Sequence, residues 1–259
     1  KYPELRYYGG FQFNQDIAPS KEWQTFGAYR FIIPQFELHR SAAGTYLVCN
    51  FLFDGQGDDI PQDIVRQLDD VQFELTLSEW EERTVLHRKD VPDQEGWNAS
   101  LNQALEQMEA QEYEKVVLAR KATLTFNDPV DPVAYLLRLR RMTEETFNFY
   151  FQTDEGHAFL GATPERLFKR QGRTIHTEAI AGTRPRGLTP RDDERYAKAL
   201  LNSEKEVREH SIVVEMIRNV LEQHCVNLIV DEEVQITQLS HVQHLCKHFM
   251  GELDAEACD

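Results

Sequence analysis

One stretch, residues 159–187, constrains the fold of this chain more than any other. It reads FLGATPERLFKRQGRTIHTEAIAGTRPRG and contains two apolar, strand-like runs separated by turn residues. The first run ends in Gly-Ala-Thr-Pro, and Glu165 follows directly after a proline that fixes the backbone. The second run, residues 173–180, leads into a Gly-rich loop in which Arg184 and Arg186 suit an anionic ligand. The stretch therefore predicts strands that present a carboxylate beside an anion-binding loop.

Upstream of this stretch the hydrophobic pattern predicts mainly strands. Apolar alternation bounded by Gly, Pro or Asp-Gly is typical of strands, and apolar residues three and four apart are typical of a helix. The expected elements are strands over 5–13, 26–33, 45–53 and 72–77 and a short helix over 61–71. From 78 to 96 the periodicity fades and charge rises, which predicts a connecting segment.

The remainder of the chain alternates helical and strand patterns. Ser100 and Gln103 form a candidate capping box, and Asp131-Pro132 is typical of a helix start. The expected elements are helices over 100–112, 131–146 and 192–224, a strand over 113–126, a hairpin of 147–153 with 157–162, and a strand over 226–236. The buried stripe of the longest helix is predicted to be Leu201, Val213, Met216, Ile217, Val220 and Leu221.

The composition is typical of a soluble globular protein. The chain has 259 residues, 41% of them hydrophobic, and no run of eighteen apolar residues, so a soluble globular protein with a sizeable core and no membrane span is expected. A net charge of -16 argues against a nucleic acid or an anionic membrane as partner, because both require an excess of Lys and Arg.

Cysteine usage indicates a reducing compartment. Cys49, Cys225, Cys246 and Cys258 show no Cys-x-x-Cys pairing, so they are expected to be reduced thiols rather than a disulfide framework or a zinc site. The sequence opens at Lys1 without a signal-peptide pattern, and a cytoplasmic location is therefore predicted.

Three separated blocks together resemble the chorismate-utilising enzymes, the family of isochorismate, anthranilate, salicylate and aminodeoxychorismate synthases. The blocks are EKVVLAR at 114–120, TPERL at 163–167 with EAIAGT at 178–183, and SEKEVREH at 203–210. They occur in the order and at the spacing of that family. The resemblance implies an α+β fold of two packed antiparallel β-sheets with helices on the outside, and the strand and helix pattern is consistent with it.

Two residues of these blocks carry proton chemistry in the family. From the residues alone, the favoured interpretations are a lysine extending from a strand end to solvent for Lys115 and an ordinary carboxylate on a solvated edge for Glu165. The resemblance implies that Lys115 is the general base of members that add water to chorismate, a position where amine-adding members typically carry glutamine. It also implies that Glu165 is the general acid that protonates the departing 4-hydroxyl.

Glu209 is the third candidate. It lies four residues before Val213 and seven before Met216, so on an ideal helix it points along the predicted buried stripe. A buried carboxylate needs a cation or a basic partner, and Lys205 one turn away could supply a structural salt bridge. The resemblance implies instead that Glu209 is a Mg²⁺ ligand, with the substrate carboxylate as a further ligand and no redox cofactor.

The segment Ala181-Gly182-Thr183 is implied by the resemblance to bind substrate. On physical grounds Gly182 could equally be a plain turn glycine, although it would let the backbone approach a ligand closely. Ala181 stands where aminodeoxychorismate synthases often carry a covalently attacking lysine, so that branch is disfavoured. Ala179 stands where anthranilate synthases usually have proline, and this favours isochorismate synthases of the menaquinone type.

His244 belongs to a further block that resembles the family, Val242-Gln243-His244-Leu245. A lone histidine is more often structural, but the resemblance implies that His244 lies near the substrate. The chain departs from the family pattern at Lys247, where a Thr or Ser is usual.

The resemblance thus implies an isochorismate synthase, a magnesium-dependent isomerase of the hydroxymutase type serving menaquinone or siderophore biosynthesis. Water would add at C2 of chorismate while the 4-hydroxyl leaves. Salicylate synthase and anthranilate synthase component I are the alternatives within the family, and a non-catalytic aromatic-acid-binding homologue is the alternative from another class. Chorismate is the expected partner, and a monomer or homodimer the expected state.

The expected organisation is one chorismate-binding-type domain over 1–259, with an N-terminal sheet region over 1–77 and a catalytic-motif region over 97–259. In the family roughly a third of the domain follows the position of residues 251–253. That third supplies a second metal-binding glutamate, an arginine for the substrate carboxylate and a glycine-rich loop. The 259 residues alone are therefore expected to be truncated and inactive or barely active.

Overall fold

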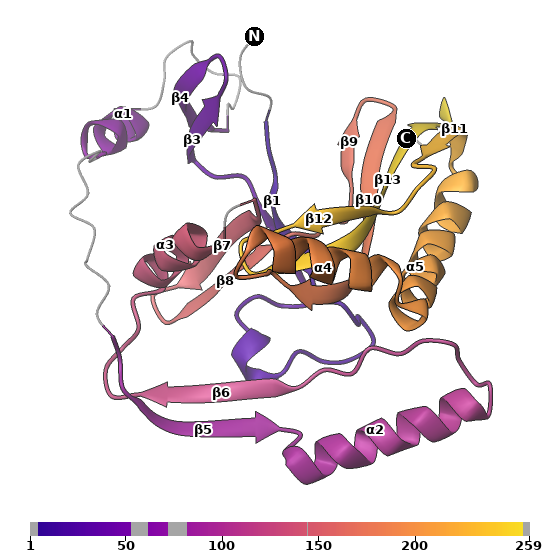
Figure 1. Cartoon of the computed structure of the whole chain (residues 1–259). Coiled ribbons are helices and arrows are strands. Elements are labelled where there is room, and N and C mark those ends of the chain that lie inside the picture. Colours follow the sequence, from indigo (N-terminus) through magenta and orange to yellow (C-terminus); the bar gives the residue numbers. More distant parts are fainter. Residues whose placement is uncertain (1–4, 53–61, 72–81, 144, 256–259) are drawn as a thin grey trace. The chain divides into compact units, whose positions relative to one another are not determined.

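The structure is a computed structural model that describes residues 5–52, 62–71, 82–143 and 145–255 (Figure 1). It divides into two compact units, Lys1–Ser78 with Tyr150–Phe159, and Glu79–Phe149 with Leu160–Asp259. The first segment of the first unit ends at Ser78, one residue after the predicted end of the N-terminal sheet region at 77. That the whole chain forms one domain stays a prediction.

The first unit contains two antiparallel strand pairs, a 3₁₀ turn and a helix. The elements are β1 (Tyr8–Phe11) paired with β2 (Tyr29–Ile32), β3 (Phe36–Ser41) paired with β4 (Gly44–Cys49), η1 (Lys21–Trp23) and α1 (Gln62–Asp69). The strands expected over 5–13, 26–33 and 45–53 and the helix over 61–71 are confirmed with shorter bounds. The strand expected over 72–77 lies outside the described residues.

The strand β3 was not predicted, and its burial pattern explains why. Glu37 is a buried residue of this strand, where its Oε1 accepts hydrogen bonds from the Tyr8 hydroxyl at 2.6 Å and from Arg6 at 3.4 Å. A charged residue on the inward row hides the apolar alternation by which a strand is recognised.

The hairpin expected around residues 147–162 is confirmed as β7 (Phe147–Asp154) and β8 (His157–Thr163). Asp154 closes the turn, because its Oδ1 accepts the backbone N–H of Gly156 at 2.8 Å. Within the first unit the ring of Phe159 meets that of Trp23 edge to face, with 5.0 Å between centroids. This geometry is a favoured aromatic arrangement and holds the hairpin tip within the unit.

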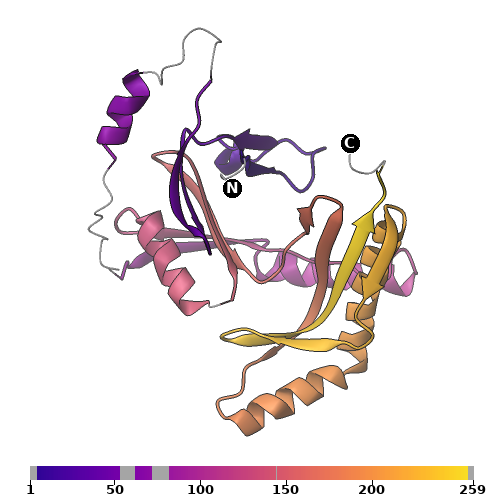
Figure 2. The same ribbon diagram turned by 90° about the horizontal axis from the view of Figure 1, so that it is seen from above.

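The second unit is organised around a five-stranded antiparallel sheet of order β11-β13-β10-β9, with β12 also paired to β13 (Figure 2). Its strands are β9 (Lys169–Gln171), β10 (Thr174–Pro185), β11 (Cys225–Val230), β12 (Gln235–Gln238) and β13 (Val242–Leu253). The expected α+β class with antiparallel sheets is confirmed. The predicted loop after Ile180 is wrong, because β10 continues to Pro185.

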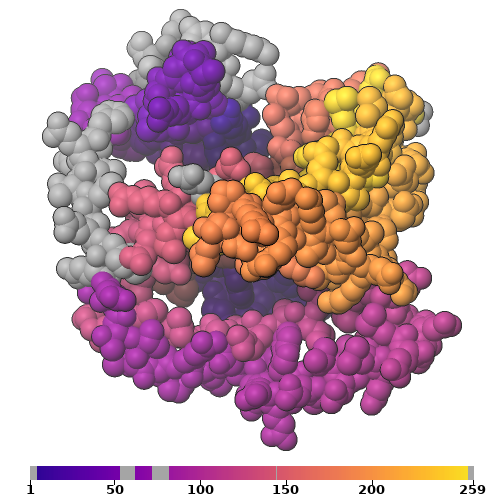
Figure 3. All heavy atoms as spheres, viewed as in Figure 1, coloured from indigo at the N-terminus to yellow at the C-terminus, as the bar shows by residue number. Residues whose placement is uncertain are grey.

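Two helices, α4 (Pro190–Leu201) and α5 (Glu204–Glu222), cover one face of this sheet and form the orange surface in Figure 3. The core between α5 and the sheet is built around Ala179, Val214, Leu221 and Phe249. The single helix expected over 192–224 is wrong in one respect, because the chain breaks at Asn202 and restarts with Ser203 as the cap of α5.

The buried side of α5 differs in part from the predicted stripe. His210, Val214 and Leu221 are its buried residues, whereas Met216 is 60% exposed and Val220 is 53% exposed. The predicted stripe is therefore wrong at Met216, Val220 and the exposed Leu201, and correct at Val213, Ile217 and Leu221.

The other described elements of the second unit are β5 (Val85–Val91), α2 (Gln94–Glu109), β6 (Lys121–Phe126) and α3 (Pro132–Met142), with β5 antiparallel to β6. The segment expected to be a simple connection over 78–96 thus contains a strand. The side chain of Asp131 accepts the N–H groups of Val133 and Ala134, and the predicted start of this helix is confirmed. Within the described ranges, none of the helices combines the length and apolar character of a membrane-spanning helix.

Two boundaries in this region were predicted wrongly. α2 starts six residues before the candidate capping box, because the side chain of Asp93 caps it by accepting the N–H of Gly96, while Ser100 lies inside the helix. The strand expected over 113–126 begins only at Lys121, because β5 supplies a partner from Lys121 onward.

Candidate active site

Lys115 and Glu209 lie together in the structure. The Nζ atom of Lys115 is 3.6 Å from the Oε1 atom of Glu209, and the two side chains are 24% and 39% exposed. Lys115 comes from the irregular segment between α2 and β6, so its predicted place in a strand is wrong. Glu209 comes from the second turn of α5. The prediction that Glu209 has a basic partner is confirmed, but the partner is Lys115 rather than Lys205.

The inward residue of this part of α5 is His210, which is 1% exposed. Its Nε2 lies 3.1 Å from the carbonyl oxygen of Ala179 in β10 and must donate, because a carbonyl only accepts. Burial lowers the pKa of His210, and the charges of Lys247 and Lys115 act in the same direction. His210 therefore takes the buried position that the sequence pattern had assigned to Glu209.

A β-bulge lies at the centre of the predicted substrate-binding segment. The register of β10 against β13 shifts between Ala181, which pairs with Leu245, and Thr183, which pairs with His244. Gly182 is the extra residue and has φ +68, a left-handed conformation that favours glycine. A side chain here would meet Glu206, whose Oε2 lies 3.2 Å from an ideal Cβ. The bulge thus brings α5 against the backbone of β10.

The bulge brings Thr183 and His244 together. His244 Nδ1 lies 3.1 Å from the carbonyl oxygen of Gly182 and 3.1 Å from Thr183 Oγ1. Because the carbonyl can only accept, Nδ1 carries the proton and Nε2 is the nitrogen left as an acceptor. Three of the predicted substrate-binding residues, Gly182, Thr183 and His244, therefore form one cluster. Ala181 lies on the other face of the strand, the face toward the helices, paired with the buried Leu245.

The two arginines expected to bind an anion are instead paired within the chain. Arg184 Nη1 lies 2.9 Å from Glu206 Oε1, and Arg186 Nη2 lies 2.6 Å from Asp193 Oδ2. The predicted anion-binding loop is therefore wrong in structure and in charge, because both guanidinium groups are neutralised by carboxylates from α4 and α5.

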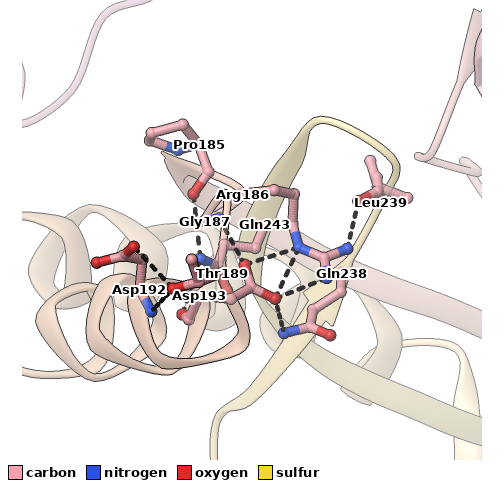
Figure 4. Close-up of polar contacts among 9 residues, drawn as sticks. All are labelled: Pro185, Arg186, Gly187, Thr189, Asp192, Asp193, Gln238, Leu239 and Gln243. Carbon is pink, nitrogen blue, oxygen red and sulfur yellow. Dashed lines mark hydrogen bonds and ion pairs between the residues drawn. The ribbon is translucent and has the colours of Figure 1, made fainter.

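The pair Arg186–Asp193 anchors a network at the end of the sheet (Figure 4). Asp193 Oδ1 accepts the N–H of Gly187 at 2.8 Å, and Arg186 also donates to the carbonyl of Leu239 at 2.7 Å. The hydrogen bonds from Arg186, followed by that from Gly187, lower the pKa of Asp193 to about 2. Gln243, which is fully buried, donates to the carbonyl of Pro185. The network ties the start of α4 to β10, β12 and β13.

Glu165 follows the end of β8 and is exposed to solvent, as expected of a carboxylate on a solvated edge. Its backbone N–H donates to Thr163 Oγ1 at 3.2 Å. The next residue, Arg166, bonds both carboxylate oxygens of Glu178 in β10, at 3.0 and 3.3 Å. Among the residues that the structure describes, the Glu165 carboxylate has no hydrogen bond or ion pair with Lys115 or Glu209.

Sequence reasoning missed three residues that build this site, Glu178, Glu206 and His210. A signal for His210 was present, since His210, Val214, Ile217 and Leu221 recur at helical spacing. The other two are carboxylates paired with arginines, and nothing in their local sequence indicates which arginine each one meets.

The site offers one candidate carboxylate for a metal. In the described part of the chain, no three His, Cys, Asp or Glu side chains gather closely enough to hold an ion. Mg²⁺ is bound in proteins through as few as one or two carboxylates and keeps several waters. Glu209, half-exposed and facing Lys115, therefore fits as one ligand of such a site and does not complete it.

Comparison with known proteins points to one family. The family model described as "Chorismate binding enzyme" matches residues 1–258. Isochorismate synthase MenF from Bacillus subtilis is 31% identical over 96% of this chain and 53% of its own length. Isochorismate synthase 2, chloroplastic, from Arabidopsis thaliana is 30% identical over 99% of this chain and 47% of its own length. The chain thus spans about half the length of these curated relatives.

A solved structure shows the same fold. The menaquinone-specific isochorismate synthase MenF from Escherichia coli superposes with a TM-score of 0.76 at 25% identity, over 98% of this chain and 57% of that one. The likeness confirms the chorismate-binding-type fold that the sequence blocks implied.

Proposed function

The chain belongs to the family of chorismate-binding enzymes, and on this premise we propose that the protein is an isochorismate synthase, which isomerises chorismate to isochorismate. One observation carries the proposal. The fold holds Lys115 beside Glu209 of α5, and the family resemblance implies that Lys115 corresponds to the base of the water-adding members. The names of the relatives support the same reaction.

The proposed chemistry is an allylic displacement. Lys115 accepts a proton from water as the water oxygen bonds to C2 of chorismate. Both ring double bonds shift, from C1=C2 and C5=C6 to C1=C6 and C4=C5, and the bond from C4 to its hydroxyl breaks. Glu165 gives its proton to that hydroxyl, which leaves as water. One water enters and one leaves, so substrate and product have the same composition, as an isomerase requires.

The bulge is the proposed substrate contact. His244 Nδ1 lies 3.1 Å from both the Gly182 carbonyl oxygen and Thr183 Oγ1, so these three residues form one polar cluster at the bulge. A hydroxyl and an imidazole in this arrangement can bind the carboxylate or hydroxyl groups of chorismate. The side chain of Ala181 lies on the opposite face of the strand, so Ala181 affects substrate binding only through its backbone, which leads into the bulge.

We also propose that Glu209 is a Mg²⁺ ligand. The ion, when bound, would neutralise charge on a substrate carboxylate. Because Glu209 contacts Lys115, occupancy of the site requires this ion pair to open or to share the carboxylate. Titration of Mg²⁺ into the protein by calorimetry should show binding that Glu209→Gln weakens by about 10- to 100-fold, while Glu215→Gln on the same helix leaves it unchanged.

The proposal is tested by resolving the products of chorismate by mass, with and without Mg²⁺ and ammonia. The low activity expected of these 259 residues should yield isochorismate only in the presence of Mg²⁺, and Lys115→Ala should lower that rate at least about 100-fold. Lys169→Ala, which removes an exposed lysine of β9, should leave the rate unchanged.

The other outcomes identify the alternatives. Salicylate with pyruvate would make the protein a salicylate synthase, and anthranilate formed with ammonia would make it an anthranilate synthase component. Chorismate that binds in calorimetry without turning over in any condition would indicate a non-catalytic homologue. Each of these results contradicts the proposed isochorismate synthase.

We further infer that the protein works in the cytoplasm, as a monomer or homodimer, in menaquinone or siderophore biosynthesis. The described cysteines Cys49, Cys225 and Cys246 are free, which supports a reducing compartment. The menaquinone-specific enzyme among the solved relatives supports the first of the two pathways.

A further inference from the structure

We propose that His210 is a positioning residue, which docks the start of α5 on β10 and thereby holds Glu209 beside Lys115. The inference rests on the proposed function, because it concerns the residues proposed as base and metal ligand. It assigns His210 no contact with substrate. Its role is to set the position of the next residue in the chain.

The first observation is the hydrogen bond of His210 itself. The side chain is 1% exposed and its Nε2 donates to the carbonyl of Ala179, which is fully buried in β10. A buried carbonyl that loses its donor is costly, so this bond favours one position of the helix over others. An aliphatic side chain of similar volume could fill the space but could not make the bond.

The second observation is that α5 makes polar contacts with β10 on both sides of the bulge. His210 bonds to Ala179 before Gly182, and Glu206 pairs with Arg184 after it, at 2.9 Å. Glu206 also packs on Gly182 itself, because an added Cβ there would lie 3.3 Å from the Glu206 Cβ. Two polar anchors along one strand fix both the position of the helix along it and its rotation.

The third observation is the spacing along the helix. Glu206 lies three residues before Glu209 and four before His210, so it neighbours both of them on the surface of α5. With Glu206 and His210 fixed on β10, the carboxylate of Glu209 is presented beside them, where it meets Lys115 at 3.6 Å. If the His210 anchor is lost, α5 can rotate or slide and this ion pair separates.

The test measures the Lys115–Glu209 interaction without using chorismate. Urea unfolding is followed for the wild type, Lys115→Met, Glu209→Gln and the double variant, and the cycle yields the coupling of the two residues. A partly exposed ion pair should change the unfolding equilibrium constant by about 2- to 5-fold. The same cycle is then measured in His210→Gln and His210→Leu proteins.

The proposal predicts that the coupling survives in His210→Gln, whose amide can donate to Ala179, and disappears in His210→Leu. Val214→Ala is the matched control, because it creates a core defect one turn further along α5 and should lower stability without changing the coupling. Coupling that persists in His210→Leu would overturn the proposal, and so would the absence of coupling in the wild type. If the Leu protein does not fold, His210→Asn replaces it, because its amide is too short to reach Ala179.

Turnover gives a second readout. For a protein that forms isochorismate, His210→Leu should lower kcat by about 10- to 100-fold with KM changed less than about 2-fold. His210→Gln should restore most of the rate, and equal losses in both variants would overturn the positioning role. If no variant turns over chorismate, the proposed function fails while the coupling measurement still decides the role of His210.

Discussion

Gly182 meets two structural requirements at once, a left-handed backbone conformation and close packing against Glu206. Its φ of +68 costs a residue with a side chain about 1–2 kcal/mol, and an added Cβ would also lie 3.2 Å from Glu206 Oε2. Because Glu206 is held by Arg184, it cannot move away freely. We expect Gly182→Ala to destabilise the protein by about 2–4 kcal/mol in urea unfolding.

The control for this substitution is Gly172→Ala. Gly172 has a similar φ of +59, but an added Cβ there would meet nothing within 4 Å. Gly172→Ala should therefore lower the free energy of unfolding only by the cost of the left-handed backbone conformation, about 1–2 kcal/mol. Equal losses at the two glycines would show that the contact with α5 is unimportant.

Asp193 gives the structure a dependence on acid pH. Its pKa falls from an ordinary 3.8 to about 2 because Arg186 and the Gly187 N–H bond its ionised form. The ionised carboxylate therefore favours the folded state. This contribution is fully present above pH 3.8 and is lost as the pH falls from 3.8 to about 2. Asp193→Asn should show a flatter urea midpoint over that window than the wild type.

Arg186→Gln should flatten the same window, because it removes the main cause of the shift. A wild-type acid dependence that both variants retain would contradict the assignment to this pair. The measurement is the urea midpoint as a function of pH.

At the scale of elements, the two helices on the sheet begin differently. Thr189 caps α4 by accepting the N–H of Asp192 at 3.2 Å, whereas Ser203 at the start of α5 makes no side-chain cap hydrogen bond. Thr189→Ala should therefore cost about 0.5–2 kcal/mol, while Ser203→Ala should stay within about 0.5 kcal/mol. Urea unfolding compares the two, and an equal loss at Ser203 would contradict the difference in capping.

The elements also show how far sequence patterns reach. The hairpin of β7 and β8 and the start of β10 were predictable, because apolar alternation and turn residues are local properties. The central strand β13 was not predicted, because its inward row of Gln243, Leu245, Lys247 and Phe249 mixes polar and apolar residues. The prediction of a strand from residue 113 onward was wrong for another reason. A strand also needs a neighbouring strand to pair with, and β5 pairs with this segment only from Lys121 onward.

The same limit applies to the site. The candidate positions Lys115, Glu165 and Glu209 followed from motifs, but which side chain each one meets depends on tertiary structure. Glu209 pairs with Lys115 and not with Lys205, and this choice of partner depends on how α5 docks on the sheet. The arginines expected to bind an anion are paired with Glu206 and Asp193, which are brought close by helices that follow the strand.

At the scale of the whole molecule, the proposed site is assembled from distant parts of the chain. Lys115 comes from an irregular segment, Glu165 from the end of β8, Thr183 from β10 and His244 from β13. The chain matches its family over nearly its full length and spans about half the length of its relatives. The fold and family are thus established by the whole chain, while the reaction is proposed from these few residues.

The most direct test of that reaction is the origin of the oxygen in the product. Chorismate is incubated with the protein and Mg²⁺ in water labelled with heavy oxygen, and the product is analysed by mass spectrometry. Addition of water at C2 with loss of the 4-hydroxyl predicts isochorismate that carries one heavy oxygen, at C2, and at least about 100-fold slower formation of this product with Lys115→Ala. Isochorismate without heavy oxygen at C2, or a product containing nitrogen, would contradict the proposed water addition.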